Sequence, residues 1–117
     1  MRVIGQQGEV KVYEVDEVPA TAELKTVEFD GKGKYIISHS ESGHHHVVPS
    51  GDCEVLERVD NVPRGMRIIY AIVNNPTMLI QDAPHPHEGV PLSKGVKMFR
   101  LQREYNPFLD EARRVAD

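Results

Sequence analysis

Turn-forming residues divide this chain into runs too short to hold helices between strands. Gly, Pro, Asn and Asp recur along the sequence, most clearly at residues 30–33, 49–52 and 74–76. Gly supplies the positive φ that tight hairpin turns require. A parallel sheet needs long crossover connections, usually helical, which these intervals do not provide. The pattern therefore predicts a mostly β fold, which is a sandwich, a jelly roll or a small barrel.

β-prone runs lie between the turns, at residues 9–15, 23–29, 34–38, 44–48, 53–59, 66–73, 77–81 and 96–105. Only the C-terminus is typical of a helix. Asn106 is a good N-cap, Pro107 suits the first helical position, and apolar residues then recur at helical spacing. We expect a short C-terminal helix over about 107–116. No repeat or change in composition divides the chain, so we expect one β domain over residues 1–117.

The composition narrows the functional classes. A length of 117 residues with 39% hydrophobic residues is typical of one globular domain. The net charge of -4 and the absence of a long Lys/Arg run disfavour nucleic acid as a partner. No apolar run reaches the roughly 18 residues of a membrane span, and the N-terminus lacks the apolar region of a signal peptide. Cys53 is the only cysteine, which excludes an intrachain disulfide and favours the cytoplasm and a buried, inert thiol.

Six histidines lie in two clusters between residues 39 and 87. Alternate residues of a strand share a face, so His44 and His46 project to one side with Cα atoms about 6.6 Å apart. Two imidazoles at that spacing can converge on one metal ion. His85 and His87 alternate with prolines that keep the chain extended, and they also share a side.

These pairs predict a metal site with His44, His46 and His87 as ligands and His85 as a contingent fourth. His39 and His45 fit such a site less well and are expected to be bystanders. The other interpretation is that the histidine-rich stretches are ordinary polar surface loops.

Three carboxylates lie close to these histidines in the sequence. Glu41, Glu88 and Asp82 are candidates for an oxygen ligand or for a residue that orients an imidazole by hydrogen bonding. Imidazole with carboxylate suits Zn, Fe, Mn or Ni and disfavours calcium. Three protein ligands would leave a coordination position for water or substrate. We find no motif for an organic cofactor.

The segment Gly43-His44-His45-His46 resembles the metal-binding strand of the cupins, small β-barrel proteins that use a Gly followed by an H-x-H pair. In that resemblance His87 takes the place of the later cupin histidine. The cupin glutamate should follow the second histidine by four or five residues, and Glu54 lies too far along the chain. The resemblance therefore implies a fold and a type of site, without an activity.

A resemblance over nearly the whole chain is closer. The sequence is similar to a family of small, uncharacterised bacterial and phage-associated proteins, which carry a Q-G-[DE]-V strand, a G-H-x-H segment, an H-x-x-H segment and a C-terminal Q-R-E-Y-[DN]-P with R-R-V-x-D. The matching segments are QGEV at 7–10, GHHH at 43–46, QREYNP at 102–107 and RRVAD at 113–117. In the second histidine segment His87 matches, whereas Pro84 replaces the first histidine and His85 is its nearest substitute. The resemblance groups the histidine segments and names no reaction.

Two functions fit these observations. The first is a binding or structural module with a histidine-based metal site, which binds a protein partner or forms a homo-oligomer through exposed strand edges. The alternative is a cupin-like, metal-dependent enzyme that acts on a small polar molecule. In that enzyme His85 or Glu41 would be the fourth ligand or the general base, and the sequence contains no obvious nucleophile motif that would assign a catalytic residue.

Overall fold

The computed structural model describes residues 1–39, 44–82 and 89–102. These residues form ten strands: β1 (Arg2–Gln7), β2 (Val10–Val15), β3 (Leu24–Thr26), β4 (Lys34–Ser38), β5 (His46–Pro49), β6 (Cys53–Arg58), β7 (Met66–Val73), β8 (Thr77–Gln81), β9 (Val90–Leu92) and β10 (Gly95–Gln102). Within these ranges, no helix has the length and apolar character needed to cross a lipid bilayer. The helix expected over about 107–116 lies outside the described residues.

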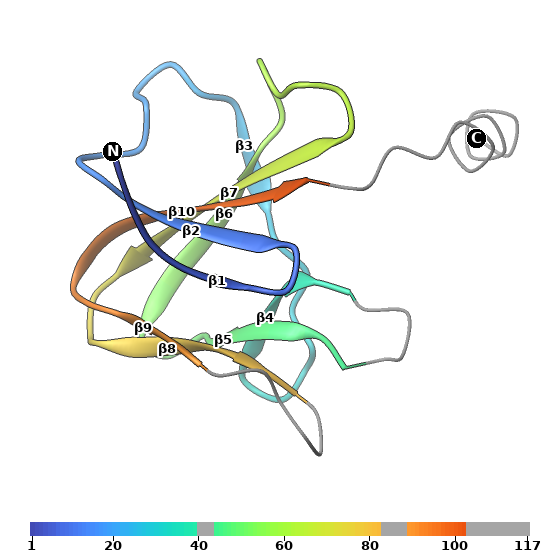
Figure 1. The fold of residues 1–117 in the computed structure, drawn as a ribbon, viewed down its shortest axis with the longest axis vertical. Coiled ribbons are helices and arrows are strands. Elements are labelled where there is room, and N and C mark those ends of the chain that lie inside the picture. The colour runs from blue at the N-terminus through green and yellow to red at the C-terminus, as the bar shows by residue number, and fades with distance from the viewer. Residues whose placement is uncertain (40–43, 83–88, 103–117) are drawn as a thin grey trace, which may run out of the picture.

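The strands form two antiparallel sheets (Figure 1). The larger sheet has the order β1-β2-β10-β7-β6-β3, and the smaller has the order β4-β5-β8-β9. Every strand pairing among the described residues is antiparallel. The prediction of a mostly β fold without parallel crossovers is therefore confirmed, whereas the likeness to the cupins remains a prediction.

The main core lies between the two sheets. It combines residues of the large sheet, such as Val12 and Phe99, with residues of the small sheet, such as Val48 and Leu79, and all four are fully buried. A second cluster around Tyr70 and Met98 covers the opposite face of the large sheet. Since β7 is thus covered on both faces, its sequence MRIIYAIV is nearly continuous in apolar residues and does not alternate.

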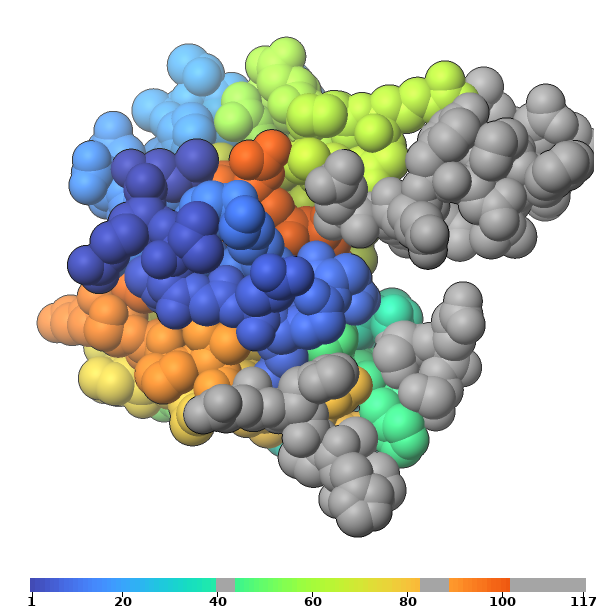
Figure 2. Space-filling view, in the orientation of Figure 1, coloured from blue at the N-terminus to red at the C-terminus, as the bar shows by residue number. Residues whose placement is uncertain are grey.

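The two sheets also meet along their edges. At one edge, β1 lies against β9, and the blue and orange surfaces of these segments adjoin in Figure 2. A Cβ on Gly5 would lie only 2.7 Å from a Val90 methyl carbon, so the absence of a side chain allows this approach. At the other edge, the chain leaves β3 and pairs with β4 through the bridge of Phe29 and Tyr35. The hydrogen bond from the Ile36 N–H to the Glu28 carbonyl, at 2.8 Å, supports that pairing.

Two strands, β1 and β9, are missing from the sequence-based prediction, which begins its first strand at residue 9. The sequence of β1 contains a glycine and two glutamines, and the three-residue β9 has a proline at its centre. Glycine and proline are uncommon in strands, so neither segment shows the sequence pattern by which strands are usually predicted. Both strands lie at sheet edges, where such residues are tolerated.

Candidate functional site

A buried histidine, His46, lies at the first position of β5 and is only 2% exposed. Its Nδ1 lies 2.8 Å from Gln7 Oε1, and Gln7 Nε2 donates to the Leu79 carbonyl at 3.2 Å. Because the Gln7 amide nitrogen is engaged with Leu79, the oxygen faces the imidazole and accepts a hydrogen bond from Nδ1. With Nδ1 as the donor, Nε2 is the nitrogen that carries the lone pair whenever the ring is neutral.

The opposite side of the ring faces Glu9, at the tip of the hairpin between β1 and β2. His46 Nε2 lies 3.6 Å from Glu9 Oε2, while Ser38 Oγ donates to the other oxygen of the same carboxylate. Gly8 precedes Glu9 with a φ of +57°, as the first position of a two-residue type II′ hairpin turn requires. A Cβ on Gly8 would lie 3.1 Å from His46 Cε1 and Nε2, so the turn also packs against the imidazole.

Two β-bulges bring these side chains together. In β1 the register shifts between Val3 and Gly5, and in β4 it shifts between Ile36 and Ser38. Because alternate residues face opposite sides, a one-residue bulge changes which residues face inward. Without the first bulge Gln7 would face away from the core, and without the second Ser38 would not pair with His46.

The separation of His46 and Glu9 has a chemical consequence. At 3.6 Å the Nε2–Oε2 distance is longer than a good hydrogen bond. Two ligands of one tetrahedral ion, each about 2.1 Å from the metal, lie about 3.4 Å from each other. The pair therefore has the spacing of two ligands of a single ion. Over the described ranges 1–39, 44–82 and 89–102, no group of three or more His, Cys, Asp or Glu residues is arranged to hold a metal.

The first histidine cluster contacts the strand that leads to the second. His46 pairs with Gln81, and the Asp82 N–H donates to the His45 carbonyl at 2.9 Å. His44 Nδ1 lies 3.1 Å from the Asp82 carbonyl oxygen, so this ring also donates from Nδ1. Of the other expected site residues, His85, His87, Glu41 and Glu88 lie outside the described residues.

His39 and His45, expected to be bystanders, contact each other edge-to-face with ring centroids 4.4 Å apart. His39 Nε2 also pairs with Glu28. His45 Nδ1 is buried, with no hydrogen-bond partner among the residues that the structure describes. His39 nevertheless lines the pocket described next.

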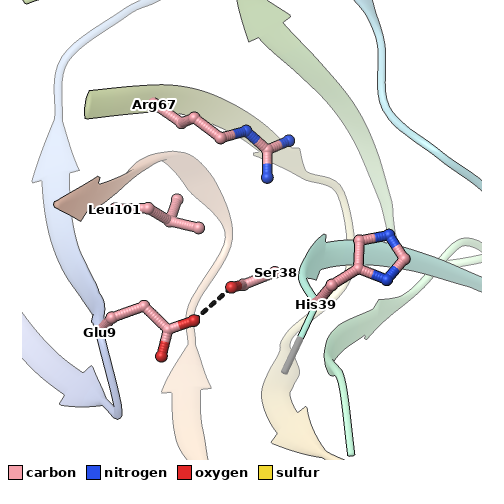
Figure 3. A pocket seen from close by; sticks show the side chains of 5 residues that line it. All are labelled: Glu9, Ser38, His39, Arg67 and Leu101. Atoms are coloured by element: carbon pink, nitrogen blue, oxygen red, sulfur yellow. Dashed lines mark hydrogen bonds between the residues drawn. The ribbon is translucent and has the colours of Figure 1, made fainter. Parts of the chain in front are cut away.

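A pocket of about 150 Å³ opens beside Glu9 (Figure 3). Its lining residues come from three strands, from the β1–β2 turn and from the position that follows β4, and they are Glu9, Ser38, His39, Arg67 and Leu101. Figure 3 shows the Arg67 guanidinium on one side of the pocket and the hydrogen-bonded Glu9 and Ser38 on the other. The pocket therefore has a guanidinium on one side and a carboxylate on the other, with Leu101 as an apolar patch.

Sequence reasoning overlooks four residues of this site. Gln7 and Glu9 belong to the QGEV segment of the family resemblance, but nothing in the local sequence connects them to a histidine about forty residues away. Ser38 depends on a bulge that the sequence does not reveal. The sequence could have pointed to Arg67, because it is the only charged residue in the apolar run 66–73.

Cys53 takes no part in the site. It is buried, and its Sγ donates to the Pro49 carbonyl at 3.3 Å. Burial, with a smaller contribution from the Asp52 charge, raises the pKa of the thiol to about 11. The expectation of a buried, unreactive cysteine agrees with this environment.

Residues 6–103 match the family model described as a domain of unknown function (DUF8820). The matched range includes Gln7, Glu9, His46 and Arg67. The comparisons with curated proteins and with solved structures give no match.

Proposed function

We propose that this chain, which belongs to the DUF8820 family of domains of unknown function, is a metal-binding module that holds one divalent ion between His46 and Glu9. The observation that carries the proposal is the orientation of His46. Its Nδ1 lies 2.8 Å from Gln7 Oε1, and its Nε2 faces a carboxylate oxygen of Glu9 3.6 Å away. Histidines that bind metals almost always donate the other ring N–H in this way, which fixes the tautomer and the ring orientation.

The proposed site needs further ligands, and the histidine clusters supply candidates. His44 donates from Nδ1 to a backbone carbonyl, as His46 does to an amide, which makes its Nε2 the nitrogen that could bind a metal. His85 follows Asp82 by three residues, a distance that a fully extended chain spans in at most about 11 Å. We propose that the remaining ligands come from among His44, His85 and His87, with Glu41 and Glu88 as residues that orient them.

The donor set narrows the choice of ion. Imidazole nitrogen with carboxylate oxygen suits Zn, Mn, Fe or Ni. The Ser38 hydroxyl and the Gln7 amide supply the hydrogen bonds that hold the two ligands in place. An ion bound here would lie at the edge of the pocket, because Glu9 is shared between the ligand pair and the pocket wall.

Metal content of the purified chain, made without a tag and loaded with Zn or Mn, tests this proposal. We expect one ion per chain by mass spectrometry of the dissolved protein. Glu9→Gln keeps the acceptor for Ser38 but removes the charge, so metal affinity should fall by more than about 100-fold, beyond the usual effect of losing an orienting partner. Glu54→Gln, at an exposed position of β6, is the matched control and should bind as the parent does.

The proposal is wrong if the parent chain binds no ion stoichiometrically, or if Glu9→Gln and His46→Gln both retain parental affinity. Thermal unfolding of each variant separates lost binding from lost folding. Glu9 is the more informative position, since its side chain is 41% exposed and its replacement leaves no cavity.

A further inference from the structure

Arg67 is the unusual residue of the pocket, because it places a charge on the inner face of the large sheet. It pairs with Leu101 of β10 next to the buried residues of the main core. Glu57, on the neighbouring strand β6, binds it from the side: Nη2 lies 2.6 Å from one carboxylate oxygen and Nε lies 3.2 Å from the other. The pair is neutral overall, and its side chains are only 28% and 13% exposed.

The hydrogen bonds of Arg67 leave donors for a ligand. A guanidinium has five N–H donors. Two bind Glu57 and one, on Nη1, binds the Ile37 carbonyl at 3.3 Å. One N–H on each terminal nitrogen therefore has no acceptor among the described residues. Two terminal donors of one guanidinium form the fork that binds both oxygens of a carboxylate.

The opposite wall adds a second attraction. Glu9 lines the pocket and also faces His46, so a cation held by that pair adds positive charge across from Arg67. An anion between these walls would interact with the metal and with the guanidinium at the same time. This part of the argument rests on the proposed metal site.

Size and lining limit what the anion can be. A cavity of about 150 Å³ holds a molecule the size of benzene, or roughly six non-hydrogen atoms. Leu101 offers an apolar surface for a short alkyl chain. We infer that the pocket between Glu9 and Arg67 binds a small aliphatic carboxylate of two to four carbons, with its carboxylate on Arg67 and its affinity raised by the metal.

Butyrate and its uncharged analogue butyramide test this inference, because they have the same number of non-hydrogen atoms. Calorimetric titration of the metal-loaded chain should show butyrate binding at least about tenfold more tightly than butyramide, since the amide is uncharged and its NH₂ group cannot accept the second guanidinium N–H. Removal of the metal with a chelator should weaken butyrate binding severalfold.

Two variants locate the effect. Arg67→Lys keeps the charge beside Glu57 but removes the fork, so butyrate affinity should fall about tenfold or more while metal content stays at the parental level. Arg58→Lys is the matched control, because Arg58 lies at the far end of β6 and pairs with Asp60. This variant should bind the metal ion and butyrate as the parent does.

The outcomes separate this inference from the proposed function. One ion per chain with no preference for butyrate, or with full butyrate binding in Arg67→Lys, overturns the inference and leaves the metal site standing. Absence of the ion overturns the proposed function. If the metal-free chain still binds butyrate and this binding needs Arg67, the carboxylate site stands without the metal. If the metal-free chain does not bind butyrate, the carboxylate site is overturned as well.

Discussion

Lys97, in β10, is fully buried, and its Nζ has no hydrogen-bond partner among the residues that the structure describes. The side chain projects into the core because it shares a face with Phe99 and with Ala71 of the neighbouring strand. Its other cross-strand neighbour, Glu14, pairs with Arg2 instead. A buried polar group without a partner costs about 1–3 kcal/mol of stability.

Replacement of this lysine by methionine should therefore stabilise the chain. Methionine keeps an unbranched stem of similar volume and removes the amine, so the apolar contacts of Lys97 remain. We expect Lys97→Met to raise the free energy of unfolding by about 2 kcal/mol. For a domain of this size, that corresponds to a rise in Tm of about 8 °C.

Urea unfolding and thermal unfolding, each followed by circular dichroism, measure the effect. Lys25→Met replaces an exposed lysine of β3 and should change stability by less than about 0.5 kcal/mol. A loss of more than about 1 kcal/mol in Lys97→Met would refute the reasoning, because it would mean that the buried amine has a compensating partner.

Three further predictions concern other parts of the fold. Cys53 should react with Ellman's reagent at pH 8 about 100-fold more slowly in the folded than in the unfolded chain, since its thiol pKa is raised to about 11. Gly8→Ala should cost about 1–3 kcal/mol in urea unfolding, and more than Gly31→Ala, because both have positive φ but only Gly8 also contacts His46. Asp60→Asn should lower Tm at pH 7. The hydrogen bond from the Glu23 N–H, and then that from Arg58, lowers the pKa of Asp60. The ionised carboxylate therefore stabilises the folded chain above the ordinary pKa of 3.8, and this stabilisation is lost as the pH falls below that value. The difference in Tm between the parent chain and Asp60→Asn should therefore narrow at pH 3.

Much of the fold could be predicted because it depends on local signals. Gly- and Pro-containing turns separate the runs, and the lengths between them exclude parallel crossovers. The run 66–73, predicted as a strand, is one, and it lies in the middle of the large sheet with both faces covered. Strand β1 could not be predicted, because its stability comes from pairing with β2 and from the close contact of Gly5 with Val90.

The candidate site could be predicted only in part. The alternation rule places His44 and His46 on one side of the chain, but it does not predict the contacts of His46 with Gln7 and Glu9, which depend on two sheets meeting and on two one-residue bulges. A bulge reverses the inward and outward sides of a strand without a clear mark in the sequence. The role of Arg67 depends on its ion pair with Glu57 on the neighbouring strand and on its place in the pocket. Both arise from the tertiary fold, so the local sequence does not predict them.

Anomalous scattering from a crystal of the metal-loaded chain tests the central claim most directly. The account predicts one anomalous peak about 2.0–2.2 Å from both His46 Nε2 and a Glu9 carboxylate oxygen. A fully loaded crystal with its anomalous peak bonded to neither His46 nor Glu9 would contradict the account.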